Sequence, residues 1–427
     1  MKFSILKEKI TPDFPVYQQG FSAREKKKSI GVNDDLYVTI ALIQSNKTVV
    51  IIALDLLNGN RRAADEIKKA VNDKYGLEQD EIIINYSHTH SSIGIKGDDD
   101  DNPENIVCYN MIKDKIIDAI GKAYKSLEDG DIYICRGKSK FGVSRRFPSE
   151  NGALWKPYFN EDAIDMDLFL LKLVDRNNNI HGIIYSYACH PTSLGPDNLW
   201  ISADYPGMVR KYLEEKNEGL ATMFLQGCGA DIKPYISADN EKFKSCNPEE
   251  VDQAGKLLAG EIQELIKKSE WRKIDVEIQT RSSDVKLYSE IWSMEKWEAL
   301  AKDQNLPLYR RNAAEKAIAK IKEGEITCYS PYYISLLRLD KKTCIIGLEC
   351  EVISDIGKKI KKILRGEDAI VLGYSNSSRF YVPTKDVLKN GGYESHSFIF
   401  AGLSGQFIHE VEDIIIGRAV TMAKELD

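Results

Sequence analysis

Short apolar runs alternate with segments of helical spacing along much of the chain. The apolar run TVVIIALDLL (48–57) precedes RRAADEIKKAVNDKYG (61–76), in which apolar residues recur at helical intervals, and a second apolar run, EIIINYSHTH (81–90), follows. Apolar runs of strand length on both sides of a helical segment predict a β–α–β unit. The first third of the chain is therefore expected to begin a sheet covered by helices.

The same alternation continues to the end of the chain. Further strands are expected at 167–175, 180–190, 221–227, 343–352 and 369–374, and helices at 104–127, 205–217, 248–268, 289–323, 354–364 and near 408–425. This order predicts an α/β fold with a mixed β-sheet core flanked by helices. The polar stretch 289–323, broken near Pro307, predicts an inserted helical hairpin, either a solvated excursion or a lid.

Composition and charge narrow the class of protein. The chain has 427 residues, 43% of them hydrophobic, and a net charge of -6, so nucleic acid is not an expected partner. Charged residues near the N-terminus and the lack of a long apolar run predict no signal peptide, no transmembrane segment and a cytoplasmic location. Eight cysteines without CxxC pairing predict buried free thiols. The acidic run at 98–101 is interpreted as a hydrated loop, and nothing indicates an oligomeric state.

Three of the six histidines follow apolar runs directly. His88 and His90 end the run in INYSHTHSSIG (84–94), and His190 ends the run before PTS. Residues two apart on a strand face the same side, so His88 and His90 are expected to look into one cavity. A metal site and ordinary polarity at a strand end both fit this pattern, and a histidine before proline is often structural.

Two glutamates stand in the apolar run GLECEV. Glu349 and Glu351 are expected on the same strand face, where an unpaired carboxylate costs several kcal/mol. A cation such as Arg338 would satisfy them, and so would a metal ion. Zinc in hydrolases typically takes three ligands from histidine and carboxylate plus a water. His88, His190 and one of the two glutamates would supply that set.

Other chemistries fit less well. HTHSSI lacks the Asp and the third His of the HxHxDH pattern of metallo-β-lactamases, and a barrel amidohydrolase needs more histidines at suitable positions. Cys189 beside His190 points to the opposite strand face, which argues against thiol catalysis. GCGADI (227–232) is interpreted as a tight turn rather than an anion cradle, since it has no phosphate-binding pattern.

Several segments taken together resemble the N-terminal catalytic domain of the neutral/alkaline non-lysosomal ceramidase family. The resemblance follows the family order through most of the chain, which is more specific than any single motif. The segments are ITPDFPVYQQGFSAR, GVNDDLYVTIALI, SHTHSSIG, SRRFP, CHPTS, QGCGADIKP, IIGLECEV, GYSNSSRFYVPT and GGYES.

The resemblance implies a zinc site and a set of catalytic residues. By motif position, zinc would be held by His88, His190, Glu351 and Tyr381, with Glu349 as the rival carboxylate. A tyrosine ligand needs a nearby dication, because free tyrosine titrates near 10.

The catalytic residues implied by the same resemblance are His90, Arg145 and Tyr393. His90 would move a proton, and Tyr393 and Arg145 would stabilise the oxyanion of an amide attacked by zinc-activated water. Arg146 follows Arg145 directly, so the choice between the two arginines stays open. Asp231 or Asp55 would orient a ligand histidine.

The expected function is therefore zinc-dependent hydrolysis of a carboxamide in an N-acyl amine or another small or lipid-like amide. A single ceramidase-like domain, 1–427, without the family's C-terminal immunoglobulin-like domain, is expected. The expected lack of a leader peptide and of a membrane-binding stripe makes ceramide itself a doubtful substrate. Two alternatives remain: a non-catalytic ligand-binding protein on the same fold, and a zinc peptidase or lactam hydrolase on the same site.

Overall fold

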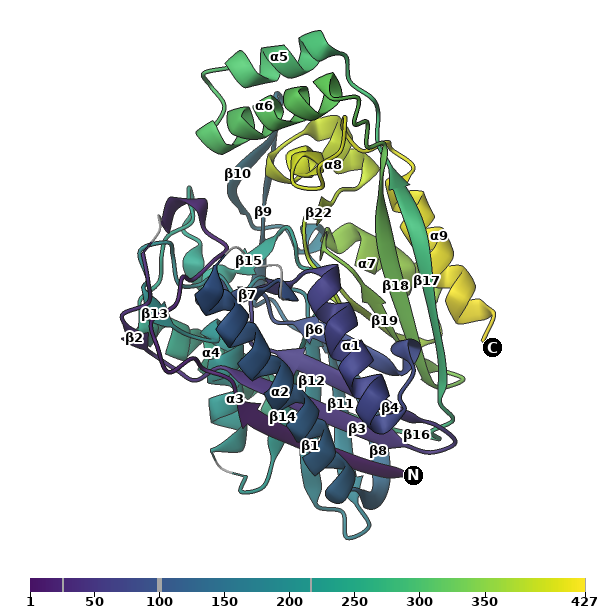
Figure 1. The fold of residues 1–427 in the computed structure, drawn as a ribbon. Coiled ribbons are helices and arrows are strands. Elements are labelled where there is room, and N and C mark those ends of the chain that lie inside the picture. The colour runs from purple at the N-terminus through teal and green to yellow at the C-terminus, as the bar shows by residue number, and fades with distance from the viewer. Residues whose placement is uncertain (25–26, 98–101, 216, 427) are drawn as a thin grey trace.

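The computed structural model describes residues 1–24, 27–97, 102–215 and 217–426, so the acidic run at 98–101 lies outside the described residues. Its core consists of two β-sheets (Figure 1). The large sheet has the order β14-β12-β11-β8-β1-β3-β4-β6, with β16 beside β8. Its strands are β1 (Lys2–Lys9), β3 (Tyr37–Gln44), β4 (Thr48–Leu54), β6 (Ile82–Tyr86), β8 (Glu128–Lys138), β11 (Asp167–Asp175), β12 (Ile180–Tyr187), β14 (Ala221–Gln226) and β16 (Arg272–Ile274).

The small sheet has the order β17-β18-β19-β21. Its strands are β17 (Gln279–Tyr288), β18 (Tyr329–Asp340), β19 (Thr343–Leu348) and β21 (Asp368–Leu372). Short strand groups near the ends of the two sheets are β2 (Gly31–Val32) with β13 (Trp200–Ile201), β5 (Asn58–Gly59) with β7 (Gly94–Ile95), β9 (Gly142–Ser149) with β10 (Gly152–Tyr158) and β15 (Ile232–Pro234), and β20 (Glu351–Val352) with β22 (Tyr381–Val382).

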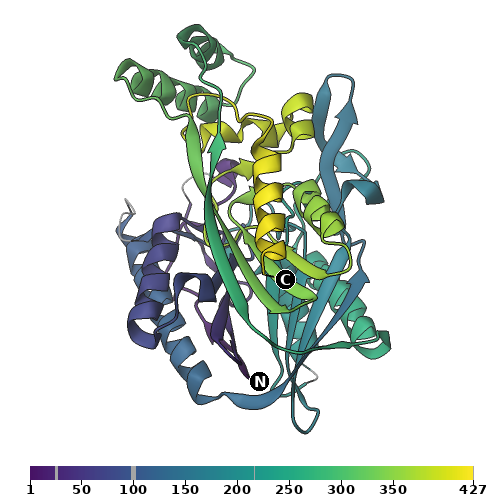
Figure 2. The same cartoon turned by 90° about the vertical axis from the view of Figure 1, so that its right-hand side faces the viewer.

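Helices cover the outer faces of both sheets. The large sheet is covered by α1 (Arg61–Tyr75), α2 (Pro103–Lys125), α3 (Asp204–Glu214) and α4 (Pro248–Lys268). The small sheet is covered by α7 (Ser354–Ile363) and α9 (Val411–Lys424), and Figure 2 shows α9 lying across it. Two helices, α5 (Met294–Lys302) and α6 (Leu308–Lys322), come between β17 and β18, and α8 (Lys385–Asn390) precedes the 3₁₀ segment η6 (Tyr393–Ile399).

The alternation of apolar residues along each strand builds these layers. On β4, Val49 and Ile51 belong to the core between the two sheets, whereas Val50 and Ile52 belong to the core under α1 and α2. Both faces are apolar because both are buried, which is why the strand reads as a continuous apolar run. The predicted α/β fold with a mixed sheet core and flanking helices is confirmed, and its layers follow the order helix, sheet, sheet, helix.

Several expected strands end earlier than the sequence pattern indicates, including the two that precede His88 and Glu349. The strand expected at 81–90 ends at Tyr86, and His88 then adopts a φ of 67°. The strand expected at 343–352 breaks after Leu348, and Cys350 has a φ of 67°. Side chains beyond these breaks no longer follow the two-residue period of a strand, so the expectation that Glu349 and Glu351 share a strand face is wrong.

A buried asparagine holds three strand ends together. The Asn85 side chain accepts a hydrogen bond from the Gln226 amide at 2.7 Å and donates to the Gly373 carbonyl at 2.8 Å. Asn85 lies on β6, Gln226 ends β14 at the other side of the large sheet, and Gly373 follows β21 of the small sheet. The ends of strands from both sheets therefore meet around one amide.

Replacing this amide should destabilise the fold. Asn85→Ala would leave the Gln226 N–H and the Gly373 carbonyl buried without their partner, which should lower the free energy of unfolding by about 2 to 4 kcal/mol. Denaturant unfolding measures the change, with the exposed turn variant Asn177→Ala as control, expected within about 0.5 kcal/mol of the parent protein. Equal stability of the two variants would contradict the role given to Asn85.

Candidate metal centre

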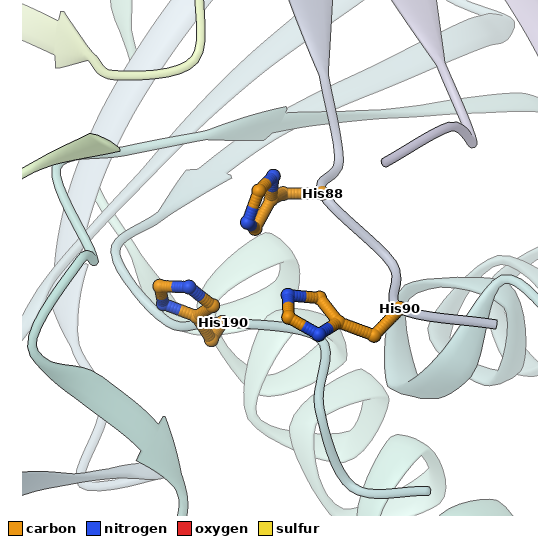
Figure 3. A group of neighbouring side chains, drawn as sticks. All are labelled: His88, His90 and His190. Carbon is orange, nitrogen blue, oxygen red and sulfur yellow. The ribbon is translucent and has the colours of Figure 1, made fainter. Parts of the chain in front are cut away.

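Three buried imidazoles from two parts of the chain meet where the strands end. His88 and His90 follow β6 and His190 follows β12. The ring centre of His88 lies 5.0 Å from that of His90 and 5.0 Å from that of His190. One ring nitrogen from each histidine lies within 4.8 Å of the others, a spacing that could hold a metal ion. Figure 3 shows the three rings turned toward a common space.

Backbone carbonyls orient two of the three rings. His88 Nδ1 lies 2.6 Å from the Leu57 carbonyl oxygen, and His190 Nδ1 lies 2.7 Å from that of Gly229. A carbonyl only accepts, so each Nδ1 is the donor and, in the neutral ring, each Nε2 carries a lone pair. Both Nε2 atoms therefore face the shared space as potential ligands.

Glu351 brings a carboxylate to the same two nitrogens. Its Oε2 lies 3.1 Å from His190 Nε2 and 3.3 Å from His88 Nε2. Glu351 starts β20, and the parallel partner β22 places Tyr381 directly opposite it in register. Tyr381 is buried as well, so the phenol comes from the neighbouring strand to the side of the carboxylate.

The charges at this point call for a cation. Burial lowers the pKa of His190 to about 4, so its ring is neutral near neutral pH. Burial raises the pKa of Glu351, but its contacts with the His88 and His190 rings outweigh burial and hold that pKa well below its usual value. The lone pair of a neutral His190 Nε2 and the ionised Glu351 Oε2 face each other at 3.1 Å, where they repel. A metal ion bound by both atoms would replace this repulsion with two coordination bonds.

His90 is held differently from the two other histidines. Neither of its ring nitrogens has a hydrogen-bond partner among the described residues, although the side chain is buried. Burial, with smaller contributions from His88 and His190, holds its pKa well below the usual range. Gly20, at a φ of 102°, packs so closely that a Cβ there would lie 2.5 Å from His90 Nδ1. An unpartnered neutral imidazole at this place is available to a substrate.

Arg145 and Tyr393 lie on the Tyr381 side of the centre. The Arg145 guanidinium lies 5.3 Å from the Tyr381 ring centre, 5.7 Å from that of Tyr393 and 4.4 Å from that of Trp155. Its Nη2 is buried and has no hydrogen-bond partner in the described part of the chain. Burial raises the pKa of Tyr393 to about 12, so its phenol keeps its proton at neutral pH.

Glu394 distinguishes the two neighbouring arginines. Arg145 Nε donates to Glu394 Oε1 at 2.8 Å, whereas Arg146 donates to Glu394 Oε2 and, at 2.8 Å, to the Gly391 carbonyl. Arg146 is thus occupied away from the centre, and Arg145 is the arginine that faces the tyrosines. Glu394 was not expected from the sequence, although its place beside Tyr393 in the motif GGYES is a usable signal.

The structure also separates Glu349 from Glu351. Glu349 is buried on the other side of the segment, where it accepts from Arg61 Nη2 at 2.8 Å, the Tyr333 amide at 2.8 Å and the Ser377 hydroxyl at 2.9 Å. The expected pairing of such a glutamate with a cation therefore holds for Glu349, with Arg61 rather than Arg338. Glu351 is the carboxylate that reaches the histidines.

The expected orienting role of Asp231 or Asp55 is not found. Asp231 accepts from the Ser354 amide at 2.8 Å, and Asp55 pairs with Arg210 at 2.7 Å. Tyr374, which the sequence did not indicate, does contact a ligand histidine: its hydroxyl lies 3.4 Å from His190 Nδ1. Its φ of 50° turns the side chain inward, a feature that apolar periodicity does not reveal.

The chain is similar to one known protein family and to two solved ceramidase structures. Residues 14–250 match the model of the neutral/alkaline non-lysosomal ceramidase N-terminal family. A neutral ceramidase from Pseudomonas aeruginosa shares 18% identity over 99% of this chain and 74% of its own, with a TM-score of 0.75. A ceramidase complexed with C2 shares 18% identity over 100% of this chain and 75% of its own, with a TM-score of 0.76.

The two glutamates provide a matched test of the centre. Glu351→Gln removes the charge that faces both Nε2 atoms and should weaken metal binding more than about 10-fold, since even outer partners of metal ligands contribute that much. Glu349→Gln should leave metal binding unchanged, because Glu349 faces Arg61. Elemental analysis after dialysis against a metal buffer measures both. Equal metal content in the two variants would rule out the centre as described.

The depressed histidine pKa predicts a pH dependence of the metal-free protein. His190 takes up a proton near 6.5 when unfolded but near 4 when buried, so the unfolded state binds more protons between these values. Stability of the metal-free protein should therefore fall as the pH is lowered through this window. Thermal unfolding of the chelated protein and of His190→Asn measures it, and the variant should show a shallower fall. An identical slope in both would contradict the assignment.

Proposed function

The chain belongs to the neutral/alkaline non-lysosomal ceramidase family, and from this membership we propose that it is a zinc-dependent hydrolase of carboxamide bonds in N-acyl amines. The match confirms the resemblance drawn from the sequence motifs, and the shared fold supports a hydrolase. The observation that carries the proposal is the Glu351 carboxylate placed between the Nε2 atoms of His88 and His190.

We propose that His88, His190, Glu351 and Tyr381 hold the zinc ion. Two imidazole nitrogens, a carboxylate and a phenol are donors that suit zinc, and the two histidines are already oriented by backbone carbonyls. Burial and the nearby Glu351 charge raise the pKa of the Tyr381 phenol well above its ordinary value, so this ligand depends on the ion to lose its proton. Zinc supplies a Lewis acid that polarises a carbonyl and makes water acidic near neutral pH.

Three side chains of this protein would act on the amide itself. The unpartnered Nη2 of Arg145 and the protonated phenol of Tyr393 would donate to the carbonyl oxygen as negative charge develops on it. His90, neutral and without a protein partner, would take a proton and return it to the leaving amine. Glu394 holds Arg145 in place through Nε, which leaves Nη2 free to donate.

An apolar acyl group suits the surroundings of Tyr393. Trp155 lies 5.2 Å from Tyr393 ring centre to ring centre, and the two side chains are 48% and 36% exposed, so aromatic surface lies beside the Tyr393 phenol. Arg310 of α6 lies 5.9 Å from the Tyr393 ring centre, which places α6 beside the same aromatic surface. We propose a small or lipid-like N-acyl amine as substrate.

Every helix in the described part of the chain is too short or too polar to cross a lipid bilayer.

Amine release from labelled ceramide and from short N-acyl amines tests the proposal. The zinc-loaded protein should hydrolyse at least one of them, lose the activity on chelation and regain it when zinc is restored. Peptides and lactams serve as further substrates in the same assay. Failure of the zinc-loaded protein to cleave any N-acyl amine would refute the proposed function.

A tyrosine variant tests the mechanism separately. Tyr393→Phe removes the donor to the developing oxyanion and should lower kcat by about 100- to 1000-fold, with a small effect on KM. Tyr124→Phe, in the last turn of α2 and stacked on Tyr75, is the matched control and should retain the parent kcat. A Tyr393→Phe enzyme as fast as the control would exclude the proposed role of the phenol.

A further inference from the structure

A cavity lies outside the metal centre, between α1 and the small sheet. It has a volume of about 440 Å³ and is bordered by Arg61, Lys68, Asp284, Tyr333 and Asn376, among others. None of the proposed metal ligands borders this cavity. The nearest link along the chain is Glu349, which lies in the cavity wall two positions before Glu351. The cavity opens to the surface, since the Asp284 side chain is 61% exposed.

The floor of the cavity contains a buried lysine that makes no close ion pair among the described residues. Lys68 is 3% exposed, donates to the Gln79 carbonyl at 3.2 Å and lies 4.7 Å from the Tyr333 ring centre. Burial lowers its pKa to about 8, and Asp65, Glu349 and Asp80, none of which forms an ion pair with it within 4.0 Å among the described residues, offset only part of this effect. A buried ammonium group is costly unless an anion balances it. A ligand anion at this place would give Lys68 the direct ion pair that these more distant carboxylates do not.

An asparagine in the wall of the same cavity has hydrogen-bonding groups without partners in the described part of the chain. Asn376 is 3% exposed, and neither Oδ1 nor Nδ2 of its side chain has a partner in the described part of the chain. Its φ of 63° places it in the left-handed region, which asparagine tolerates better than most residues. A buried amide without partners costs free energy, so its presence in the cavity wall points to a polar ligand.

The charges change sign between the floor and the mouth. Arg61 does not add a free positive charge, because it pairs with Glu349 at 2.8 Å and with Asp284 at 2.7 Å. The mouth instead carries the exposed carboxylate of Asp65, which makes no ion pair within 4.0 Å among the described residues. A simple anion would meet the carboxylates at the mouth, and a simple cation would meet Lys68 at the floor.

We propose that this cavity binds a small zwitterion of the α-amino-acid class, with its carboxylate toward Lys68 and Asn376 and its ammonium group toward Asp65. The carboxylate accepts from the Lys68 ammonium and from Asn376 Nδ2, and the ammonium group balances Asp65. This site goes beyond the proposed hydrolase function, which uses none of these three residues.

Binding is tested on the full-length protein without reference to turnover. The probes are the common L-amino acids, screened by thermal shift and then measured by isothermal titration calorimetry, with acetate and methylamine as single-charge probes. At least one amino acid should bind with a stoichiometry of one, and acetate and methylamine should bind at least about 10-fold more weakly.

Two variants locate the binding in the cavity. Lys68→Met removes the cation, and Asn376→Gly removes the amide while keeping the φ of 63° accessible. Each should weaken amino-acid binding at least about 10-fold, whereas the rim variant Lys69→Met should change it less than about twofold. Thermal unfolding confirms that each variant is folded before it is titrated.

Three results would overturn the proposal. These are the absence of binding by every amino acid, acetate binding as tight as that of the best amino acid, and unchanged affinity in both Lys68→Met and Asn376→Gly. Because calorimetry does not need hydrolysis, a failure here is distinguishable from a failure of the proposed hydrolase function.

Discussion

The hydrogen bonds of the Asn85 amide join the ends of strands that come from opposite sides of the large sheet and from the small sheet. One side chain contacts the Gln226 amide and the Gly373 carbonyl, and a further bridge joins Gly227 to Leu372 nearby. β6 is followed by His88 and His90, β14 by Gly229, whose carbonyl orients His190, and β21 by Tyr374. The histidines and the carboxylate converge because the strands that carry them end at one place.

Bringing the histidines and Glu351 together costs electrostatic free energy, because their electron pairs face each other in a buried space. Two imidazole nitrogens and an ionised carboxylate face each other in a buried space, and His90 and Arg145 have buried atoms without partners in the described residues. The backbone adds strain, since His88, Cys350 and Tyr374 all have positive φ. Strain and unsatisfied polar groups that gather at one place are typical of functional sites. A divalent ion and an amide substrate would satisfy these groups.

The sequence predicted the layers better than the geometry of the centre. Continuous apolar runs such as 48–57 and 167–175 indicate strands buried on both faces, and they were placed correctly. Strands β17 and β18 were not predicted, because half-exposed polar residues in β17 and the inserted helices before β18 obscure the pattern. Convergence of His88 and His90 was expected, but for the wrong local reason, since the chain leaves the strand before both.

Most of the contacts that the sequence did not predict join residues far apart along the chain. The pairing of Arg145 with Glu394 spans 249 residues, so no local pattern of apolar residues indicates it.

The proposed function depends on one metal ion between His88, His190 and Glu351. Anomalous diffraction at the zinc absorption edge from crystals of the zinc-loaded protein tests it most directly. One strong peak is expected about 2.0–2.1 Å from both Nε2 atoms. No peak at this place, or one held by other residues, would contradict it.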